Sequence, residues 1–211
     1  MDIYLVRHGQ STGNNQGRLI GWSDHPLTDL GRAQAQRLAA RLVGTRFAAL
    51  YASDLSRAVA TAAALTAQGA PPARLDPQLR EIDSGAWSGL SDAQVRERFP
   101  DEWRRWHEER DPHLHRGGRE SYDQAATRML DALCAIARRH PGGTVAVISH
   151  GGVIRAAVAR MMGLDLRRIW TLSIANASIT RIRPFAPITA RADGPCGRAL
   201  TINDTAHLEA S

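Results

Sequence analysis

Two histidines in this chain stand at matching positions, each directly after a short apolar run and directly before a glycine. His8 follows the run 3–6 and is preceded by Arg7, while His150 follows the run 145–148. A single histidine after a strand is more often a surface or capping residue than a functional one. Two such positions, one of them flanked by an arginine, instead favour a site where imidazole and guanidinium groups converge on an anion.

Both runs read as strands, and helical patterns lie between them. Strands that alternate with helices predict an α/β protein, a three-layer α/β/α sandwich on a mostly parallel, mixed central sheet. In such a sheet the active site lies at the carboxyl ends of the strands, so both histidines should meet in one crevice. The glycines that follow them, Gly9 and Gly151, let backbone N–H groups approach an anion closely.

Hydrophobic periodicity and turn residues predict the other elements of a single domain over 1–211. Thr28 is the expected N-cap of a helix that ends at Gly44, and Ser53 or Asp54 is the expected N-cap of a helix that runs to about residue 68. Further helices are predicted over 121–139 and 153–162. Extended segments are predicted at 3–6, 48–52, 75–82, 145–148, 170–174, 179–183 and 199–202.

The segment of about 85–121 departs from this alternation. It is rich in Trp, Arg, Glu and His and is broken by prolines and paired glycines, so we predict a small lid insertion there. Trp103, Trp106 and His107 lie close together on an expected lid helix, where they either pack on the core or form a wall of the substrate pocket. His113 and His115 are alternate residues, but no carboxylate or cysteine accompanies them in a ligand pattern, so no metal site is expected.

Composition limits the class of protein. The 211 residues are 43% apolar and 23% charged, which is typical of a folded domain and excludes a disordered or fibrous chain. The net charge is +6, and all 27 residues counted as Lys or Arg are arginine, whose guanidinium group binds phosphate bidentately. These arginines are scattered and aromatic residues make up 5% of the chain, so no nucleic-acid partner is expected.

The sequence contains no recognisable membrane span or secretory signal peptide. No apolar run approaches the ~18 residues of a membrane span, and the N-terminus lacks the long apolar core of a signal peptide. We therefore expect a cytoplasmic protein with no membrane partner. Cys134 and Cys196 are too few for a disulfide framework and are expected to be free thiols.

A series of short motifs runs in order along nearly the whole chain. They are Arg7-His8-Gly9-Gln10-Ser11-Thr12 with Asn14, Gly21-Trp22-Ser23-Asp24-His25-Pro26-Leu27-Thr28, Ser53-Asp54-Leu55-Ser56-Arg57-Ala58, Leu79-Arg80-Glu81-Ile82 and Ser149-His150-Gly151-Gly152. Together they resemble the histidine phosphatase (phosphoglycerate mutase-like) superfamily. The resemblance implies hydrolysis of a phosphomonoester.

Phosphoryl transfer needs an in-line nucleophile, fixed cations and a proton donor for the leaving oxygen. The resemblance implies that His8 is the nucleophile and forms a phosphohistidine, although the attacking nitrogen cannot be identified from sequence. It also implies that Glu81 is the general acid, with Asp83 as its nearby rival. Read without its motif, Glu81 would be a solvated loop carboxylate.

The resemblance also implies a set of residues that hold the phosphoryl group. Arg7, Arg57 and His150 would provide a positively charged cradle, and Asn14 would bind the phosphoryl group or orient the loop. Read alone, Arg57 would be a surface arginine of a helix and Asn14 a turn former. The full set implied for phosphate and substrate binding is Arg7, Asn14, Gly21, Arg57, His150 and Gly151.

Within this family the chain is more similar to the phosphatases than to the cofactor-dependent phosphoglycerate mutases. It lacks lysine and has a compact lid, and Glu120-Ser121 before a long helix is similar to the phosphatase branch, although Arg119 stands where that branch usually has glycine. We expect a small phosphorylated substrate and no cofactor. A mutase and a non-catalytic phospho-ligand binding module are the alternatives.

The sequence leaves the substrate and the oligomeric state open. Four arginines of the lid either bind a second anionic group of the substrate or are solvated. They are Arg104, Arg105, Arg116 and Arg119.

Overall fold

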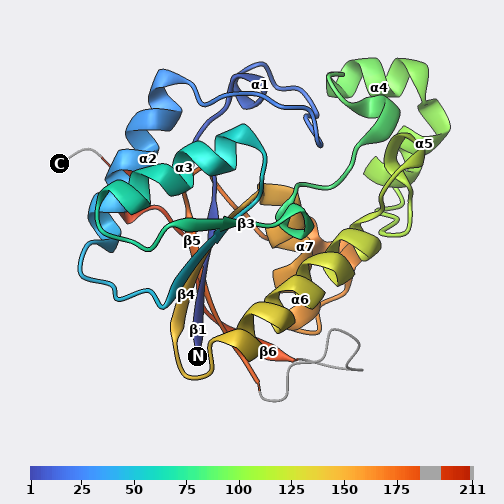
Figure 1. Ribbon diagram of the computed structural model, residues 1–211. Coiled ribbons are helices and arrows are strands. Elements are labelled where there is room, and N and C mark those ends of the chain that lie inside the picture. Colours follow the sequence, from blue (N-terminus) through green and yellow to red (C-terminus); the bar gives the residue numbers. More distant parts are fainter. Residues whose placement is uncertain (186–195, 210–211) are drawn as a thin grey trace.

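One six-stranded sheet forms the centre of the protein (Figure 1). The computed structural model describes residues 1–185 and 196–209. The strand order is β3-β2-β4-β1-β5-β6. β1, β2, β3 and β4 are mutually parallel where they pair, while β5 is antiparallel to β1 and to β6. The strands are β1 Asp2–Arg7, β2 Ala49–Ala52, β3 Ala73–Leu75, β4 Thr144–Ser149, β5 Ile179–Pro184 and β6 Gly197–Asp204.

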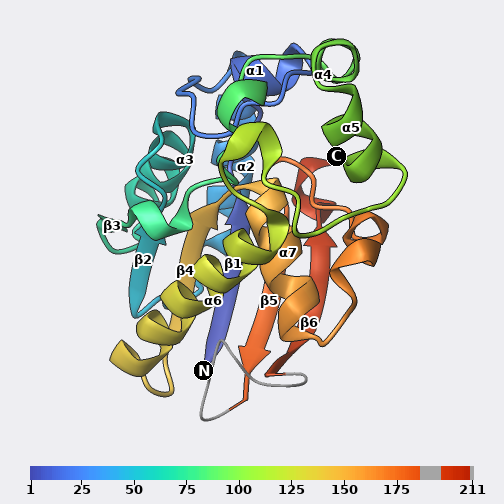
Figure 2. The ribbon, with the colours of Figure 1, turned by 90° about the vertical axis from the view of Figure 1, so that its right-hand side faces the viewer.

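Helices cover both faces of the sheet (Figure 2). α2 (Asp29–Leu42) and α3 (Ser56–Ala67) pack on one face, and α6 (Tyr122–Arg139) and α7 (Gly151–Met161) pack on the other. This arrangement confirms the predicted three-layer fold. None of the helices within 1–185 and 196–209 is long and apolar enough to cross a bilayer.

The side-chain alternation of the central strands separates two layers of core. Ile3 and Leu5 of β1 belong to the cluster beneath α6 and α7, whereas Val6 belongs to the cluster beneath α2 and α3. All three side chains are at most 1% exposed. A strand that is apolar on both faces must lie between two helical layers, which explains the continuous apolar runs of β1 and β4.

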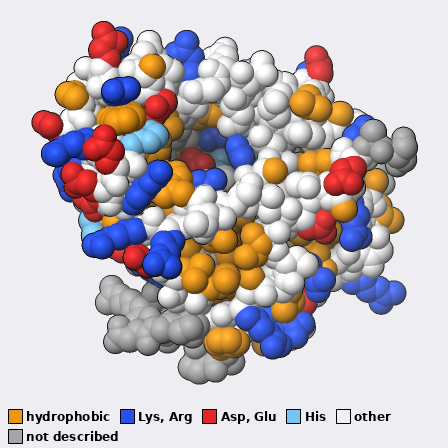
Figure 3. All heavy atoms as spheres, turned by 180° about the vertical axis from the view of Figure 1, so that it is seen from behind, with side chains coloured by type: hydrophobic (Ala, Val, Ile, Leu, Met, Phe, Trp, Pro, Cys, Tyr) orange, Lys and Arg blue, Asp and Glu red, His pale blue; other side chains and the backbone are white. Residues whose placement is uncertain are grey.

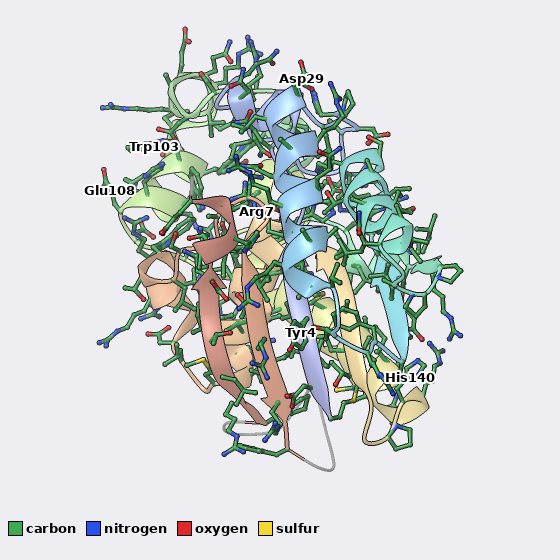
Figure 4. The ribbon with its side chains drawn as sticks, turned by 90° about the vertical axis from the view of Figure 1, so that its left-hand side faces the viewer. Tyr4, Arg7, Asp29, Trp103, Glu108 and His140 are labelled. Atoms are coloured by element: carbon green, nitrogen blue, oxygen red, sulfur yellow. The ribbon has the colours of Figure 1, made fainter. Side chains whose placement is uncertain are left out.

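The register of β1 and β4 brings their carboxyl ends together. Arg7 is paired with Ser149, and the His8 N–H donates to the Ser149 carbonyl at 3.0 Å. Figure 4 shows Arg7 at this end of the sheet, with Tyr4 further down the strand and His140 near the opposite end. The loops that follow the two strands therefore start side by side.

The lid is attached to the core by aromatic packing. It contains the short helix α4 (Asp92–Arg98), α5 (Pro100–His107) and 3₁₀ turns at Gly85–Trp87 and Arg116–Gly118. The fully buried Trp87 packs edge-on against Trp106, with ring centroids 5.5 Å apart. Trp106 is 8% exposed and belongs to the main hydrophobic cluster. The lid is thus fixed against the body of the protein, on one side of the strand ends (Figure 1).

The predicted N-cap of α2 is correct, whereas the predicted N-cap of α3 is wrong. Thr28 caps α2 as predicted, since its side chain accepts from the Gly31 N–H. The N-cap of α3 is Leu55, which makes no side-chain cap hydrogen bond. Ser53 and Asp54 were the predicted caps, but tertiary partners engage both side chains: Ser53 contacts His150 and Asp54 pairs with Arg80.

Two predicted extended segments were also wrong in part. Within 75–82, only Leu75 belongs to a strand, and a 3₁₀ helix follows at Pro77–Leu79 because Asp76 caps it and Pro77 begins it. The segment 170–174 does not pair in the sheet. Trp170 lies in the 3₁₀ helix Leu166–Thr171, where its ring packs edge-on against Trp106 and Tyr122.

Both cysteines are free, as predicted, and both are buried. Burial raises the pKa of the Cys134 thiol to about 11 and also raises the pKa of Cys196. The two side chains are therefore neutral thiols that pack as small apolar groups.

Candidate active site

The two histidines of the sequence analysis lie in contact at the carboxyl ends of β1 and β4. The ring centroids of His8 and His150 are 5.0 Å apart. His8 is 2% exposed and His150 is fully buried. The prediction that the two histidine loops converge is therefore correct.

His8 has a defined tautomer. Its Nδ1 lies 2.6 Å from the carbonyl oxygen of Gly9. A carbonyl oxygen can only accept, so Nδ1 carries the proton and Nε2 holds an unshared electron pair. Burial lowers the pKa of His8 well below its usual value, and the charges of Arg7 and Arg57 lower it further. His8 is thus a neutral imidazole with one nitrogen available as a nucleophile.

His150 supports this site with both ring nitrogens. Arg57 Nε donates to His150 Nδ1 at 3.2 Å, so the other nitrogen, Nε2, carries the proton and donates to Ser53 Oγ at 2.8 Å. Burial lowers the pKa of His150 well below its usual value, and the nearby His8, Arg57 and Arg7 lower it further. His150 is therefore neutral and orients Arg57.

Arg57 is a buried residue of the first turn of α3, not a surface arginine. It is 1% exposed. Its Nη1 donates to the Ser23 carbonyl at 2.8 Å and its Nη2 to the Gly21 carbonyl at 2.9 Å. Gly21 has a φ of 51° and a Cβ there would lie 2.8 Å from the Ser84 nitrogen. Glycine is therefore required where the loop turns to present its carbonyl to Arg57.

Arg7 is held by the backbone in a similar way. Its Nη1 donates to the Ile174 carbonyl at 2.7 Å, and its buried Nε has no hydrogen-bond partner among the described residues. A Cβ on Gly151 would lie 3.0 Å from that Nε, so the glycine allows the close approach. Burial lowers the pKa of Arg7, but an arginine guanidinium stays charged in proteins.

Glu81 lies at the amino end of α7. Its Oε1 accepts from the N–H groups of Ile82 and Val153, both at 2.9 Å, and its Oε2 accepts from the Gly152 N–H at 3.0 Å. Glu81 lines the site cavity. Asp83 does not line it, and its Oδ1 accepts from the Gly85 N–H at 3.0 Å. Of these two carboxylates, only Glu81 reaches the cavity.

An ion pair between two partly buried side chains holds the segment that carries Glu81. Arg128 Nε and Nη2 bind the two Glu120 oxygens at 2.8 and 2.9 Å. The same guanidinium donates to the carbonyls of Gln78, Arg80 and Glu81, and Glu120 accepts from the Asp83 N–H at 3.0 Å. We call Glu120 and Arg128 the clamp. The sequence analysis did not single out Arg128, because the periodicity of its segment predicts a helix and gives no sign of the partners of this side chain.

Asn14 lies in the cavity wall and is fixed by two contacts. It forms a capping box with Ser11 at the start of the short helix α1 (Thr12–Asn15). Its Oδ1 also accepts from Asn176 Nδ2 at 3.2 Å, and Asn176 donates to the His8 carbonyl at 3.1 Å. Asn176 and Ser53 are site residues that the sequence reasoning missed, because their partners lie far away in the chain.

These groups open into a cavity of about 310 Å³. Among the residues that the structure describes, five arginines, one carboxylate (Glu81) and three rings of Trp and Tyr line it. On the face seen in Figure 3, a hollow shows basic, acidic and histidine side chains at its floor. Trp106 both packs on the core and lines the cavity, whereas Trp103 and His107 do not line it. The arginines are Arg7, Arg18, Arg57, Arg116 and Arg155, and the rings are Trp106, Tyr122 and Trp170.

The site brings together groups that are suited to phosphoryl transfer. Within the described residues, no group of three or more His, Cys, Asp or Glu side chains could hold a metal ion. His113 and His115 are exposed, and His115 Nδ1 contacts the Arg119 carbonyl at 3.0 Å. Phosphoryl transfer uses a neutral imidazole nitrogen, positive charge and a carboxyl group, and this site has His8, the half-buried Arg7 with the buried Arg57, and Glu81.

Comparisons with known proteins agree with this chemistry. The family model of the histidine phosphatase superfamily (branch 1) matches residues 3–186. Phosphoserine phosphatase 1 of Hydrogenobacter thermophilus is 34% identical, covering 85% of this chain and 85% of that protein. Metal-independent phosphoserine phosphatase of Arabidopsis thaliana is 38% identical, covering 76% of this chain and 68% of that protein.

A mutase-named relative and a solved structure are also similar. Probable phosphoglycerate mutase GpmB of Cronobacter sakazakii is 32% identical, covering 86% of this chain and 84% of that protein. The solved structure of Bacillus stearothermophilus YhfR has a TM-score of 0.87 at 32% identity and covers 99% of both chains.

The buried neutral histidines predict that stability falls in mild acid. Below pH 6.5 the unfolded chain protonates His8 and His150, whereas the folded chain does not because both pKa values are lowered. The free energy of unfolding should therefore be highest above that pH and fall by up to ~1.4 kcal/mol per pH unit for each histidine below it. Urea unfolding between about pH 8 and pH 5.5 measures this slope.

Replacing one histidine identifies the source of the slope. His8→Asn should reduce the slope by up to ~1.4 kcal/mol per pH unit, the contribution of one proton. His113→Asn, at an exposed histidine, should leave the slope unchanged. An unchanged slope in His8→Asn would show that the acid sensitivity arises elsewhere.

The clamp should contribute more to stability than an exposed ion pair. The Glu120 and Arg128 side chains are 14% and 15% exposed, so Glu120→Gln leaves a largely buried guanidinium without its carboxylate and should cost about 2 kcal/mol. Asp111→Asn is the matched control, because its partner Arg105 is 46% exposed, and it should cost less than ~1 kcal/mol. Equal losses in urea unfolding would contradict the role of the clamp.

Proposed function

Since this chain belongs to branch 1 of the histidine phosphatase superfamily and is a phosphatase of that family, we propose that it hydrolyses a small phosphorylated metabolite through a phosphohistidine on His8. The observation that carries this proposal is the state of His8. Its Nδ1 donates its proton to the Gly9 carbonyl, and its free Nε2 belongs to a ring whose pKa is lowered by burial and further by Arg7 and Arg57.

In the first step, His8 Nε2 attacks the phosphorus atom and the bond from phosphorus to the ester oxygen breaks. Glu81, protonated for this step, gives its proton to the leaving oxygen, which departs as an alcohol. The guanidinium groups of Arg7 and Arg57 balance the charge on the phosphoryl oxygens. The products of the step are the free alcohol and phosphohistidine.

In the second step, water replaces the histidine. The Glu81 carboxylate takes a proton from the water as its oxygen bonds to phosphorus, and the bond between phosphorus and Nε2 breaks. Inorganic phosphate leaves, His8 is again neutral, and Glu81 is again protonated. The two steps need no electron acceptor, and water is the only second reactant.

The remaining predicted site residues have supporting roles in this proposal. His150 orients Arg57 through its Nδ1, and Gly21 does so through its carbonyl. Asn14 and Gly151 line the cavity, where the amide group of Asn14 and the backbone N–H of Gly151 are donors for phosphoryl oxygens. His150 thus acts through Arg57, since it does not itself line the cavity.

Two observations support hydrolysis without a metal ion. The arginines of the cavity provide the positive charge that a divalent cation supplies in other phosphoryl-transfer sites. One relative is itself named a metal-independent phosphoserine phosphatase. Phosphoserine, named in two relatives, supports a small phosphorylated metabolite as the substrate class.

The phosphohistidine can be trapped. Rapid quenching of the enzyme with a radiolabelled phosphomonoester, in EDTA, should give protein-bound label that is stable to base and labile to acid. His8→Ala should abolish the label and lower turnover by about 10³-fold or more. His113→Ala is the control and should label normally. Normal turnover in His8→Ala, or a requirement for added divalent ion, would contradict the mechanism.

Products distinguish a phosphatase from a mutase. With 3-phosphoglycerate, if it is used, the phosphatase should release inorganic phosphate, and added 2,3-bisphosphoglycerate should not stimulate turnover. Isomerisation without release of phosphate would overturn the hydrolytic step and leave the phosphohistidine step intact.

The role of Glu81 as proton donor predicts a dependence on the leaving group. An alkyl phosphate expels a basic alkoxide, whereas p-nitrophenyl phosphate expels a stable phenolate that needs little protonation. Glu81→Gln should therefore slow single-turnover phosphorylation by ~10²–10⁴-fold with an alkyl phosphate and far less with the nitrophenyl ester. Asp83→Asn is the control and should show no such difference. Equal losses for both esters in Glu81→Gln would show that Glu81 only positions other groups.

A further inference from the structure

Trp22 lies outside the active-site cavity, yet its side chain is bound to the residue that carries the proposed general acid. Its indole Nε1 donates to the Glu81 carbonyl oxygen at 2.6 Å. Trp22 is 39% exposed and does not line the cavity. Its side chain can therefore affect the reaction only through the residues that it holds.

The two residues that flank Trp22 hold Arg57. The Gly21 carbonyl accepts from Arg57 Nη2 at 2.9 Å, and the Ser23 carbonyl accepts from Arg57 Nη1 at 2.8 Å. Three consecutive residues thus contact both the proposed phosphate-binding guanidinium and the segment of the proposed proton donor.

The next residue binds the same helix as its neighbours do. Asp24 Oδ1 accepts from the Ser56 N–H at 2.9 Å. This contact satisfies a backbone donor at the start of α3, whose own N-cap residue makes no side-chain cap hydrogen bond. We call residues 21–24 the connecting segment, because three of its residues are bound to α3 and the fourth is bound to Glu81.

An ion pair keeps the Trp22 ring in place. The Arg80 guanidinium lies 4.8 Å from the ring centre, which is close enough for a cation–π contact. Arg80 Nε also donates to Asp54 Oδ1 at 2.7 Å, and both side chains of this pair are partly buried. Asp54 directly precedes Leu55, the N-cap of α3. The group that stacks on Trp22 is therefore anchored at the start of the same helix.

Contacts hold Glu81 at both its carboxyl group and its backbone. The carboxyl group accepts from the N–H groups of Gly152 and Val153. The backbone carbonyl accepts from Trp22 at 2.6 Å and from Arg128 Nη2 at 3.2 Å, and a carbonyl oxygen has two lone pairs for such donors. Loss of the indole N–H would thus release the Glu81 backbone on one side and leave its other partners in place.

The position of Glu81 relative to Arg57 matters for the proposed chemistry. A general acid must lie within hydrogen-bond distance of the leaving oxygen, whose place depends on the phosphoryl group bound to Arg57. Glu81 follows the 3₁₀ helix Pro77–Leu79, whereas Arg57 belongs to α3. Contacts between two separate elements therefore set this distance, and a displacement of about 1 Å can lower a rate by ~10²-fold.

We propose that Trp22 is a positioning residue whose indole N–H fixes the Glu81 carboxyl group relative to the phosphoryl group bound to Arg57. The connecting segment makes this possible because it carries the contacts to both residues. The inference rests on the proposed function and deepens it, since it assigns the alignment of the proton donor to a residue outside the cavity.

Trp22→Phe tests this role, because it keeps an aromatic ring beside Arg80 and removes the N–H donor. Single-turnover phosphorylation with an alkyl phosphate should slow by about 10-fold, and that with p-nitrophenyl phosphate by less than ~2-fold, since the nitrophenolate needs little protonation. Binding of inorganic phosphate should be unchanged, because the Gly21 and Ser23 carbonyls still hold Arg57. Equal losses for both esters, or no loss with the alkyl phosphate, would overturn the proposal.

A double variant shows whether Trp22 acts through Glu81. In a Glu81→Gln background, adding Trp22→Phe should change phosphorylation by the alkyl phosphate by less than ~2-fold, because the group that Trp22 positions no longer donates a proton. A further loss of about 10-fold would show that Trp22 acts independently of Glu81, and the proposal would be wrong.

Trp103→Phe is the matched control. Trp103 Nε1 donates to Asp92 Oδ1 at 3.2 Å, and the Arg96 guanidinium lies 5.0 Å from the ring centre. Trp103 also lies outside the cavity, so this variant removes the same kind of donor beside the same kind of stacked arginine. Both esters should react within ~2-fold of the wild-type rate. A loss as selective as that of Trp22→Phe would contradict a specific role of Trp22.

Amide exchange separates this inference from the proposed function. The N–H groups of Gly152 and Val153 donate to the Glu81 carboxyl group, so a less constrained Glu81 should leave them less protected. Their exchange, followed by NMR, should be about 3- to 10-fold faster in Trp22→Phe and unchanged in Trp103→Phe. If wild-type protein hydrolysed no phosphomonoester, the proposed function would fail. Faster exchange would then still support the positioning of Glu81, and unchanged exchange would overturn it.

Discussion

The site depends on one buried hydrogen bond, in which His8 Nδ1 donates to the carbonyl of Gly9. It fixes the tautomer, while burial and two neighbouring guanidinium groups keep the ring neutral. The nitrogen that remains free, Nε2, keeps its electron pair, as the nucleophilic role that we propose for His8 requires. The parallel pairing of β1 with β4 makes this possible, because it encloses His8 against His150 and removes both rings from water.

Buried arginines impose a second constraint, since taking a charged group out of water costs several kcal/mol even after relaxation. The protein offsets this cost with backbone carbonyls: Ser23 and Gly21 accept from Arg57, and Ile174 accepts from Arg7. Carbonyl partners orient a guanidinium without cancelling its charge, so that charge stays available for an anion. The Glu81 carboxyl group accepts hydrogen bonds from backbone N–H groups at the start of α7, so its partners there are not the arginines.

Two pairs of arginines in the cavity are held in different ways. Arg7 and Arg57, which we propose to bind the phosphoryl group, are held by backbone carbonyls. Arg116 and Arg155 instead lie over the rings of Tyr122 in α6 and Trp170 in the 3₁₀ helix Leu166–Thr171. Arg7 belongs to β1 and Arg57 to α3, whereas Arg116 belongs to the lid and Arg155 to α7.

The sequence by itself determined the α/β architecture and the convergence of His8 with His150, because apolar runs and the glycines after them are local signals. It also placed Glu81 and Arg57, but only through resemblance to a family, since each read alone is an ordinary surface residue. Tertiary structure alone decided the tautomer of His8, the contact of Ser53 with His150, and the place of Arg155 in the cavity. It also overrode the predicted cap of α3 and the predicted strand at Trp170. These features depend on contacts between residues far apart in the chain, such as the 97 positions between Ser53 and His150, and local periodicity carries no record of such contacts.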